Sequence, residues 1–171
     1  MKNLNKTGLK DKTPSETVLT TLSKNSTEHN AVIGVRRKGT EKIRLKIYKN
    51  TTTYDNILRS KEGTVNIFSD AKTLLEYGLS EFLNKNPSPQ FLESEEINCP
   101  YLKDSLASIE FEVDESEKDI VNDKIGKSQL VKITGLVKKV HIKEDIEPHP
   151  LKRTDLYLIE AAIVGTRIRE A

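Results

Sequence analysis

Residues 16–70 read ETVLTTLSKNSTEHNAVIGVRRKGTEKIRLKIYKNTTTYDNILRSKEGTVNIFSD, and this stretch decides the expected fold. It opens with three strand-like runs, Glu16–Leu22, Asn30–Arg37 and Lys42–Tyr48, the last of which alternates apolar and polar residues. The loops between these runs are too short for crossover helices, so the runs predict an antiparallel meander. A fourth strand is expected at Thr64–Phe68, after a short helix.

The short helix is expected over Thr51–Lys61, with a threonine as its N-terminal cap. The first turn of a helix has unpaired N–H groups and the positive end of the helix dipole, which together favour an anion. The hydroxyls of Thr51 and Thr53 and the amide of Asn56 would add to such a phosphate site. Plain helix capping explains the same residues, and the sequence leaves both interpretations open.

Uncharged polar residues gather where the expected strands and this helix begin or end. They are Thr20, Thr21, Asn30, Thr51, Thr53, Asn56 and Asn66. Hydroxyls and amides can fix a ligand without the cost of burying charge, as a cofactor groove requires. Each residue taken singly also fits a turn or a cap. The functional interpretation therefore depends on the combination.

After residue 70 the pattern predicts a helix and two more strands. The helix begins at Ser69 or Asp70, and its apolar residues share one face. Strands are expected at Ser105–Val113 and Gln129–Ile142, with a bend or bulge at Gly135. Asp114–Lys124, between these strands, is expected to be an acidic, exposed loop or short helix.

A final helix is expected over Thr154–Arg169, and it is apolar on most of its sides. A helix of this kind is buried on more than one side, which suggests a subunit interface.

The composition fits one domain over residues 15–171, preceded by a disordered basic tail over residues 1–14. No apolar run approaches the length of a membrane span, and the N-terminus lacks the apolar core of a secretory signal. A single cysteine, Cys99, excludes an internal disulfide and is expected to be a small buried hydrophobe. We therefore expect a cytoplasmic protein without a metal site, because His141 and His149 are too isolated to supply one.

The net charge is only +2, but the charge is unevenly distributed. Residues 24–49 are strongly basic, and residues 110–123 are strongly acidic. The basic strands could attract a phosphate-bearing ligand, or they could be the solvated outer face of a sheet. Nucleic-acid binding is disfavoured, since only 5% of the residues are aromatic and the basic strand lacks interleaved stacking rings.

Several segments together resemble the flavin reductase-like FMN-binding split β-barrels, and most closely a small, largely uncharacterised, mainly archaeal flavoprotein family. The segments are Glu16–Thr21, Asn30–Val35 ("N-A-x-x-G"), Tyr48–Asn56 ("Y-K-x-x-x-T-Y-x-N"), Gly63–Ile67 ("G-x-x-x-N") and, in the closing helix, Arg153, Glu160, Thr166 and Arg167. No single segment is specific, whereas the ordered set spans roughly residues 15–169.

The resemblance implies a mainly β protein with flanking helices: a six-stranded antiparallel split barrel that forms a homodimer, with FMN near the interface. Thr20 and Thr21 would lie beside the flavin ring, and Asn30 and Ala31 at its polar edge. Tyr48 would pack near the ring or merely end its strand.

The resemblance also assigns residues to the rest of the cofactor. The ribityl chain and phosphate would be held by Thr51, Thr53 and Asn56, and Asn66 would line the same groove. The phosphate also needs a cation, for which Arg44, Lys46 and Arg153 are candidates that the sequence does not separate.

Two functions follow from these expectations. The first is an FMN-dependent oxidoreductase, in which the flavin carries the chemistry and a nicotinamide or other electron donor binds transiently, since no Gly-rich dinucleotide loop is present. The second is a non-enzymatic flavin-binding or partner-binding module. The sequence identifies neither a catalytic residue nor a substrate.

Overall fold

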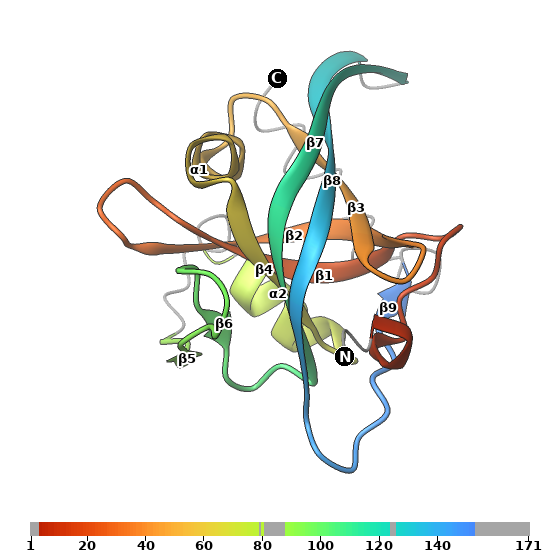
Figure 1. The fold of residues 1–171 in the computed structure, drawn as a ribbon. Helices are drawn as coiled ribbons and strands as arrows, with labels where there is room; N and C mark the ends of the chain where they lie inside the picture. Colours follow the sequence, from red (N-terminus) through yellow and green to blue (C-terminus); the bar gives the residue numbers. More distant parts are fainter. Residues whose placement is uncertain (1–3, 79, 81–87, 124–125, 153–171) are drawn as a thin grey trace.

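The computed structural model describes residues 4–78, 80, 88–123 and 126–152, and its core is an antiparallel barrel (Figure 1). Six strands form the barrel in the order β2-β3-β8-β7-β4-β1, and pairing between β1 and β2 closes it. Their bounds are β1 Ser15–Leu22, β2 Glu28–Lys38, β3 Lys42–Tyr48, β4 Glu62–Ile67, β7 Ala107–Asp123 and β8 Gly126–Ile142. A short strand, β9 (Leu151–Lys152), pairs with the start of β1. The expected six-stranded antiparallel barrel and its opening meander are confirmed.

Strand alternation separates an apolar interior from a polar outer face. Leu19, Val65, Ile109 and Val140 stand opposite one another across four adjacent strands, and all belong to the main apolar cluster. Residues at the intervening positions of β1, β4 and β7 face outward, because successive side chains of a strand point to opposite faces. Thr20, Thr64, Asn66, Ser108 and Glu110, which are buried polar residues, lie on this outer face.

Gly135 lies at an irregularity of β8, as expected. The extra residue is on the partner strand, because Val113 pairs with Gly135 and Glu115 with Thr134, which leaves Asp114 bulged. A Cβ atom on Gly135 would lie 2.5 Å from Cδ2 of Phe111, a fully buried ring. Glycine is therefore required here by the close approach of the aromatic ring.

The expectation of a loop or short helix at Asp114–Lys124 is wrong, because β7 continues as a strand to Asp123. The acidic residues of this strand pair with lysines of β2, β3 and β8. The pairs are Lys42–Asp114 at 2.6 Å, Lys132–Asp119 at 3.1 Å, Lys46–Asp119 at 3.4 Å and Lys38–Glu115 at 3.7 Å. The sequence pattern predicts an exposed segment here because the lysines that pair with these acidic residues lie far away in the sequence.

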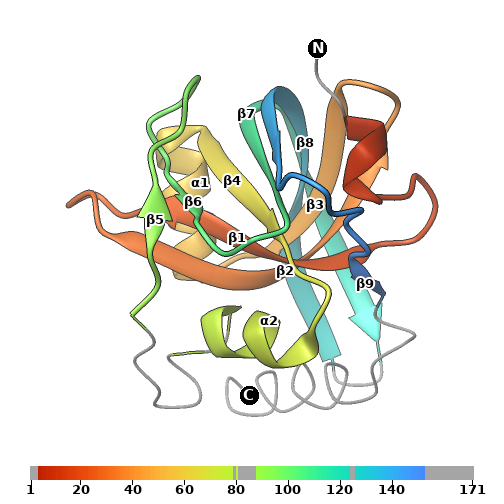
Figure 2. The same ribbon diagram turned by 90° about the horizontal axis from the view of Figure 1, so that it is seen from below.

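Two helical segments pack at opposite sides of the barrel, as both ribbon views show (Figures 1 and 2). On one side α1 (Thr52–Ser60) inserts Ile57 into the main apolar cluster. On the other side the 3₁₀ helix η1 (Leu4–Thr7) and the residues after it bury Leu4 and Leu9 in the same cluster.

The packing of η1 corrects the expected disordered tail for residues 4–14. Besides the buried leucines, the guanidinium of Arg37 pairs with the carboxylate of Asp11 at 2.9 Å, and the N–H of Arg37 donates to the carbonyl of Lys10 at 3.0 Å. Two leucines spaced five residues apart give no helical or strand period, which is why the sequence pattern missed them.

The outer face of β1 and β4 is covered by α2 (Ala71–Gly78) and by a covering segment, residues 91–105, which contains the short pair β5 (Phe91–Leu92) and β6 (Tyr101–Leu102) (Figure 2). Leu74 of α2 packs with Val18, Phe68 and Leu102 in a second apolar cluster. The N–H of Thr73 donates to Oδ1 of Asp70 at 2.8 Å, so Asp70 is the cap of this helix.

The apolar face expected for α2 packs against the second apolar cluster, through Leu74 and Leu75. The expected final helix, Thr154–Arg169, lies outside the described residues. Within the described part of the chain, no helix is both long and apolar enough to cross a membrane.

Candidate functional site

The N-terminus of α1 is capped by Thr51, as expected. The Thr51 hydroxyl oxygen accepts the N–H of Tyr54 at 3.2 Å, and the same hydroxyl donates to the carbonyl of Tyr48 at 2.9 Å. Capping therefore occupies the Thr51 side chain. The N–H groups of Thr52 and Thr53 precede the first internal helical bond, and they remain the natural anion donors of this helix.

Two side chains of α1 bind the barrel through polar contacts. Asn56 donates from Nδ2 to Oγ1 of Thr21 on β1 at 3.1 Å, and Oγ1 of Thr53 lies 3.1 Å from Nε2 of His29 on β2. Thr53 is 3% exposed and Asn56 5% exposed, so both side chains point toward the barrel. These contacts fix the helix over the ends of β1 and β2.

A second pair of polar residues lies on the opposite face of β1 and β2, since successive side chains of a strand point to opposite faces. Thr20 and Asn30 stand opposite each other on β1 and β2, and the Thr20 hydroxyl donates to Oδ1 of Asn30 at 2.7 Å. Thr20 is fully buried, whereas Asn30 and its neighbour Ala31 are half-buried. Tyr48, at the end of β3, is 38% exposed.

We call these residues the α1 cluster. It consists of Thr20, Thr21, His29, Asn30, Thr51, Thr53 and Asn56. The structure thus places these expected site residues in two groups, one under α1 and one, Thr20 with Asn30, on the opposite face of β1 and β2. His29 was missed by the sequence interpretation, although its position directly before Asn30 was a usable signal.

Asn66 has a different role from the one expected. It is fully buried, and its Nδ2 donates to the carbonyl of Val18 at 3.1 Å and to Oγ1 of Thr20 at 3.0 Å. Its Oδ1 accepts the N–H of Leu102 at 2.8 Å and the hydroxyl of Ser108 at 3.0 Å. The expectation that Asn66 lines a groove is therefore corrected: its amide holds protein groups on both sides.

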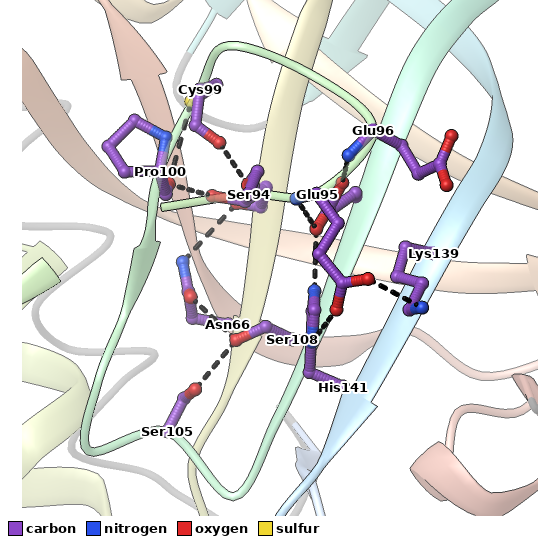
Figure 3. A network of polar contacts seen from close by, with 12 residues as sticks. Asn66, Ser94, Glu95, Glu96, Cys99, Pro100, Ser105, Ser108, Lys139 and His141 are labelled. Atoms are coloured by element: carbon purple, nitrogen blue, oxygen red, sulfur yellow. Dashed lines mark hydrogen bonds and ion pairs between the residues drawn. The ribbon is translucent and has the colours of Figure 1, made fainter. Parts of the chain in front are cut away.

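Glu110 anchors the covering segment, and Figure 3 shows its partners Glu95, Glu96 and His141 gathered at one end of that segment. The Glu110 carboxylate is fully buried on β7, and it accepts the N–H of Glu95 at 2.9 Å and the N–H of Glu96 at 2.8 Å. Oε1 of Glu110 also lies 2.6 Å from Nε2 of His141 on β8. A buried carboxylate needs such donors, because an unpaired charge in the interior is very costly.

Further bonds complete what we call the covering network, namely Thr64, Asn66, Ser108, Glu110 and His141 with their partners in the covering segment. Thr64 donates from Oγ1 to the carbonyl of Pro100 at 2.7 Å. The His141 ring stacks on the ring of Tyr101, with centroids 4.4 Å apart. His141 is thus a locally bonded residue, and the described residues contain no group of three side chains that could hold a metal ion.

Cys99 lies in the covering segment and is fully buried, as expected. Its thiol donates to the carbonyl of Thr20 at 3.3 Å. Burial raises the pKa of this thiol to about 12, so it stays protonated at neutral pH. A nucleophilic role for Cys99 is thereby disfavoured, because the thiolate is the reactive form.

Ion pairs with acidic residues occupy some of the cations of the basic strands. Lys46, one of the three expected phosphate partners, pairs with Asp119. Arg44 is exposed on the outer face of β3, opposite Arg36 on β2. Arg153 lies outside the described residues. Of these three candidates, the described structure leaves Arg44 as the one without an ion pair to a described residue.

Comparison with known proteins identifies relatives of this chain. The family model described as "Protein of unknown function (DUF447) N-terminal domain" matches residues 15–144. The uncharacterized protein MJ1453 of Methanocaldococcus jannaschii is 30% identical over 158 residues, which cover 90% of this chain and 74% of that protein.

Two solved structures share the fold. The FMN-bound protein MM1853 from Methanosarcina mazei, a member of the same family, superposes with a TM-score of 0.69 at 20% identity, covering 99% of this chain and 82% of that one. The flavin reductase PheA2 superposes with a TM-score of 0.59 at 21% identity, covering 77% of this chain and 80% of that one. The expected resemblance to flavin reductase-like split barrels is therefore confirmed at the level of the fold, and the chain belongs to the DUF447 family.

Proposed function

We propose that this protein binds FMN at the α1 cluster and acts as an oxidoreductase of the flavin reductase-like type. The observation that carries the proposal is that the expected residues meet at the ends of β1 and β2: Thr21, Thr53 and Asn56 bond under α1, and Thr20 bonds to Asn30 on the opposite face of the same strands. Support comes from the family member MM1853, whose structure is FMN-bound.

The polar groups of the α1 cluster fit the two ends of a flavin nucleotide. At the start of α1, backbone N–H groups and the exposed Thr52 suit a phosphate. At the strand ends, half-buried Asn30 presents an amide beside Ala31, which suits the polar edge of the ring. Thr21 and Asn56 hold α1 on the barrel, and Thr20 holds the amide of Asn30.

FMN would supply the hydride or electron transfer at this site, and the protein would supply binding and orientation. The α1 cluster contains no carboxylate and no cysteine, and His29 is its one titratable side chain. We therefore assign no catalytic residue. The homodimer with FMN near its interface and the transient electron donor are part of the same proposal.

The direct test is the visible absorption spectrum of the freshly purified protein, with the released chromophore identified by mass. Flavin absorption bands and the mass of FMN would support the proposal. A colourless protein that also fails to take up added FMN would contradict it.

Side-chain variants test the location of the site. Thr53→Val and Asn56→Ala should each weaken FMN binding, whereas Thr40→Val, at the exposed β2–β3 turn, should leave it unchanged. If all three variants bound FMN as tightly as the wild type, the flavin site would lie elsewhere. Light scattering of the flavin-loaded protein would test the homodimer.

The alternative is a flavin-binding module without turnover, which would use the same binding residues. Oxidation of NADH or NADPH by the FMN-loaded protein separates the two functions. Turnover with either nicotinamide supports the oxidoreductase. Tight FMN binding without oxidation of either nicotinamide supports the module.

A further inference from the structure

The orientation of the Asn66 amide is determined by backbone groups on both of its sides. Its oxygen faces the N–H of Leu102, which can only donate, and its NH₂ group faces the carbonyl of Val18, which can only accept. A flipped amide would place donor against donor and acceptor against acceptor. Because Asn66 is fully buried, no water compensates for such a mismatch.

This fixed amide determines the direction of the next hydrogen bond. Nδ2 of Asn66 donates to Oγ1 of Thr20 at 3.0 Å and so occupies a lone pair of that oxygen. The Thr20 hydroxyl is fully buried, so its proton needs an acceptor within the protein. That acceptor is Oδ1 of Asn30, at 2.7 Å.

Asn30 is oriented in turn by Thr20. With its oxygen held by the Thr20 hydroxyl, its NH₂ group points to the other side, and no hydrogen bond between described residues uses that group. Asn30 is half-buried, so the NH₂ group lies at the exposed edge of the strand face that carries Thr20. The order of bonds runs from Leu102 through Asn66 and Thr20 to Asn30.

We propose that Asn66 is a positioning residue, which acts through Thr20 to make Asn30 a hydrogen-bond donor toward the bound ligand. The identity of that ligand depends on the proposed function, whereas the orientation of Asn30 does not. The site would then select a ligand with an acceptor atom at this place, such as a ring carbonyl or an unprotonated ring nitrogen of oxidised flavin. A ligand with an N–H group there would be rejected, because donor would face donor.

The orientation can be measured in the protein without ligand. In nuclear Overhauser spectra, the Asn30 NH₂ protons should show no strong contact with the Thr20 side chain in the wild type or in Thr20→Ser. In Thr20→Val the hydroxyl is lost at nearly constant volume, and contacts between the Asn30 NH₂ protons and the new side chain should appear. A strong contact in the wild type would mean that the NH₂ group faces Thr20 and would overturn the proposal.

The effect on recognition is measured by FMN titration. Thr20→Val should weaken binding about five- to tenfold, the loss expected for one ordered hydrogen bond. Thr20→Ser keeps the hydroxyl and should bind within about twofold of the wild type. If Thr20→Val bound FMN as tightly as the wild type and the Asn30 amide kept its orientation, Thr20 would not orient Asn30, and the proposal would be overturned.

The two proposals fail in different ways. If the wild type does not bind FMN while Asn30 has the stated orientation, the flavin assignment is wrong and the positioning role stands. If the wild type binds FMN while Asn30 has the opposite orientation, the positioning role is wrong and the flavin site stands.

Discussion

The covering network and the α1 cluster are built from similar residues next to each other, and they use them differently. Asn66 and Asn30 both bond to the hydroxyl of Thr20, one from β4 and the other from β2. Asn66 is fully buried and bonds to protein groups on both sides, whereas Asn30 is half-buried and keeps its NH₂ group free of described partners. An amide whose hydrogen-bonding groups are all used inside the protein has a structural role. An amide that keeps an unused donor at the surface is a candidate for ligand recognition.

The largest expected effect is on the covering network. Glu110→Ala removes the acceptor of two backbone N–H groups and of His141, and should lower the free energy of unfolding by about 3–5 kcal/mol. Denaturant unfolding monitored by circular dichroism measures the change. Glu112→Ala, two residues along β7 with its carboxylate on the surface, should cost less than about 1 kcal/mol. Equal costs would mean that Glu110 does not hold the covering segment.

Asn66→Ala should have the next largest effect. It leaves the N–H of Leu102 and the carbonyl of Val18 without their side-chain partner, and should cost about 2–4 kcal/mol of stability. Hydrogen exchange of the Leu102 amide should quicken in this variant. A protected Leu102 amide would show that the covering segment is held without Asn66.

Asn30→Ala should change FMN affinity more than stability, the reverse of what is expected for Asn66→Ala. Because one face of Asn30 is open, we expect a loss of less than about 1 kcal/mol in stability. FMN affinity should fall by about five- to tenfold, because a donor at the surface of the α1 cluster is lost. Thermal unfolding without ligand and FMN titration separate the two effects. A large stability loss with unchanged FMN affinity would make Asn30 structural like Asn66.

The smallest effect should be confined to alkaline pH. Burial raises the pKa of the Cys99 thiol from its ordinary value of 9.0 to about 12. The unfolded chain therefore loses this proton first, and the folded state loses stability as the pH rises from 9.0 toward about 12. Cys99→Ala should be less stable at pH 7 but should show a shallower decline over that range. An equal slope in both proteins would contradict the burial of the thiol.

Local sequence rules were sufficient where neighbours along the chain decide the structure. The alternation in Lys42–Tyr48 gave a strand, and the threonines from residue 51 gave a capped helix. The irregularity at Gly135 was also expected, although the ring of Phe111 that requires it was not. The strand 114–123 was missed because its carboxylates are neutralised by lysines of β2, β3 and β8, which approach it only in the folded barrel.

The sequence by itself determined the barrel class, the family and the set of polar residues to which the proposed cofactor site belongs, because strand alternation, caps and ordered motifs are local properties. Only the tertiary structure decided which of these residues are buried and bonded within the protein and which remain accessible. It buried Asn66 beneath Leu102 and left Asn30 half-exposed, although both are asparagines on barrel strands. It also packed Leu4 and Leu9 against the barrel. The burial and hydrogen-bond partners of each side chain depend on segments that are distant in sequence, and no local pattern encodes them.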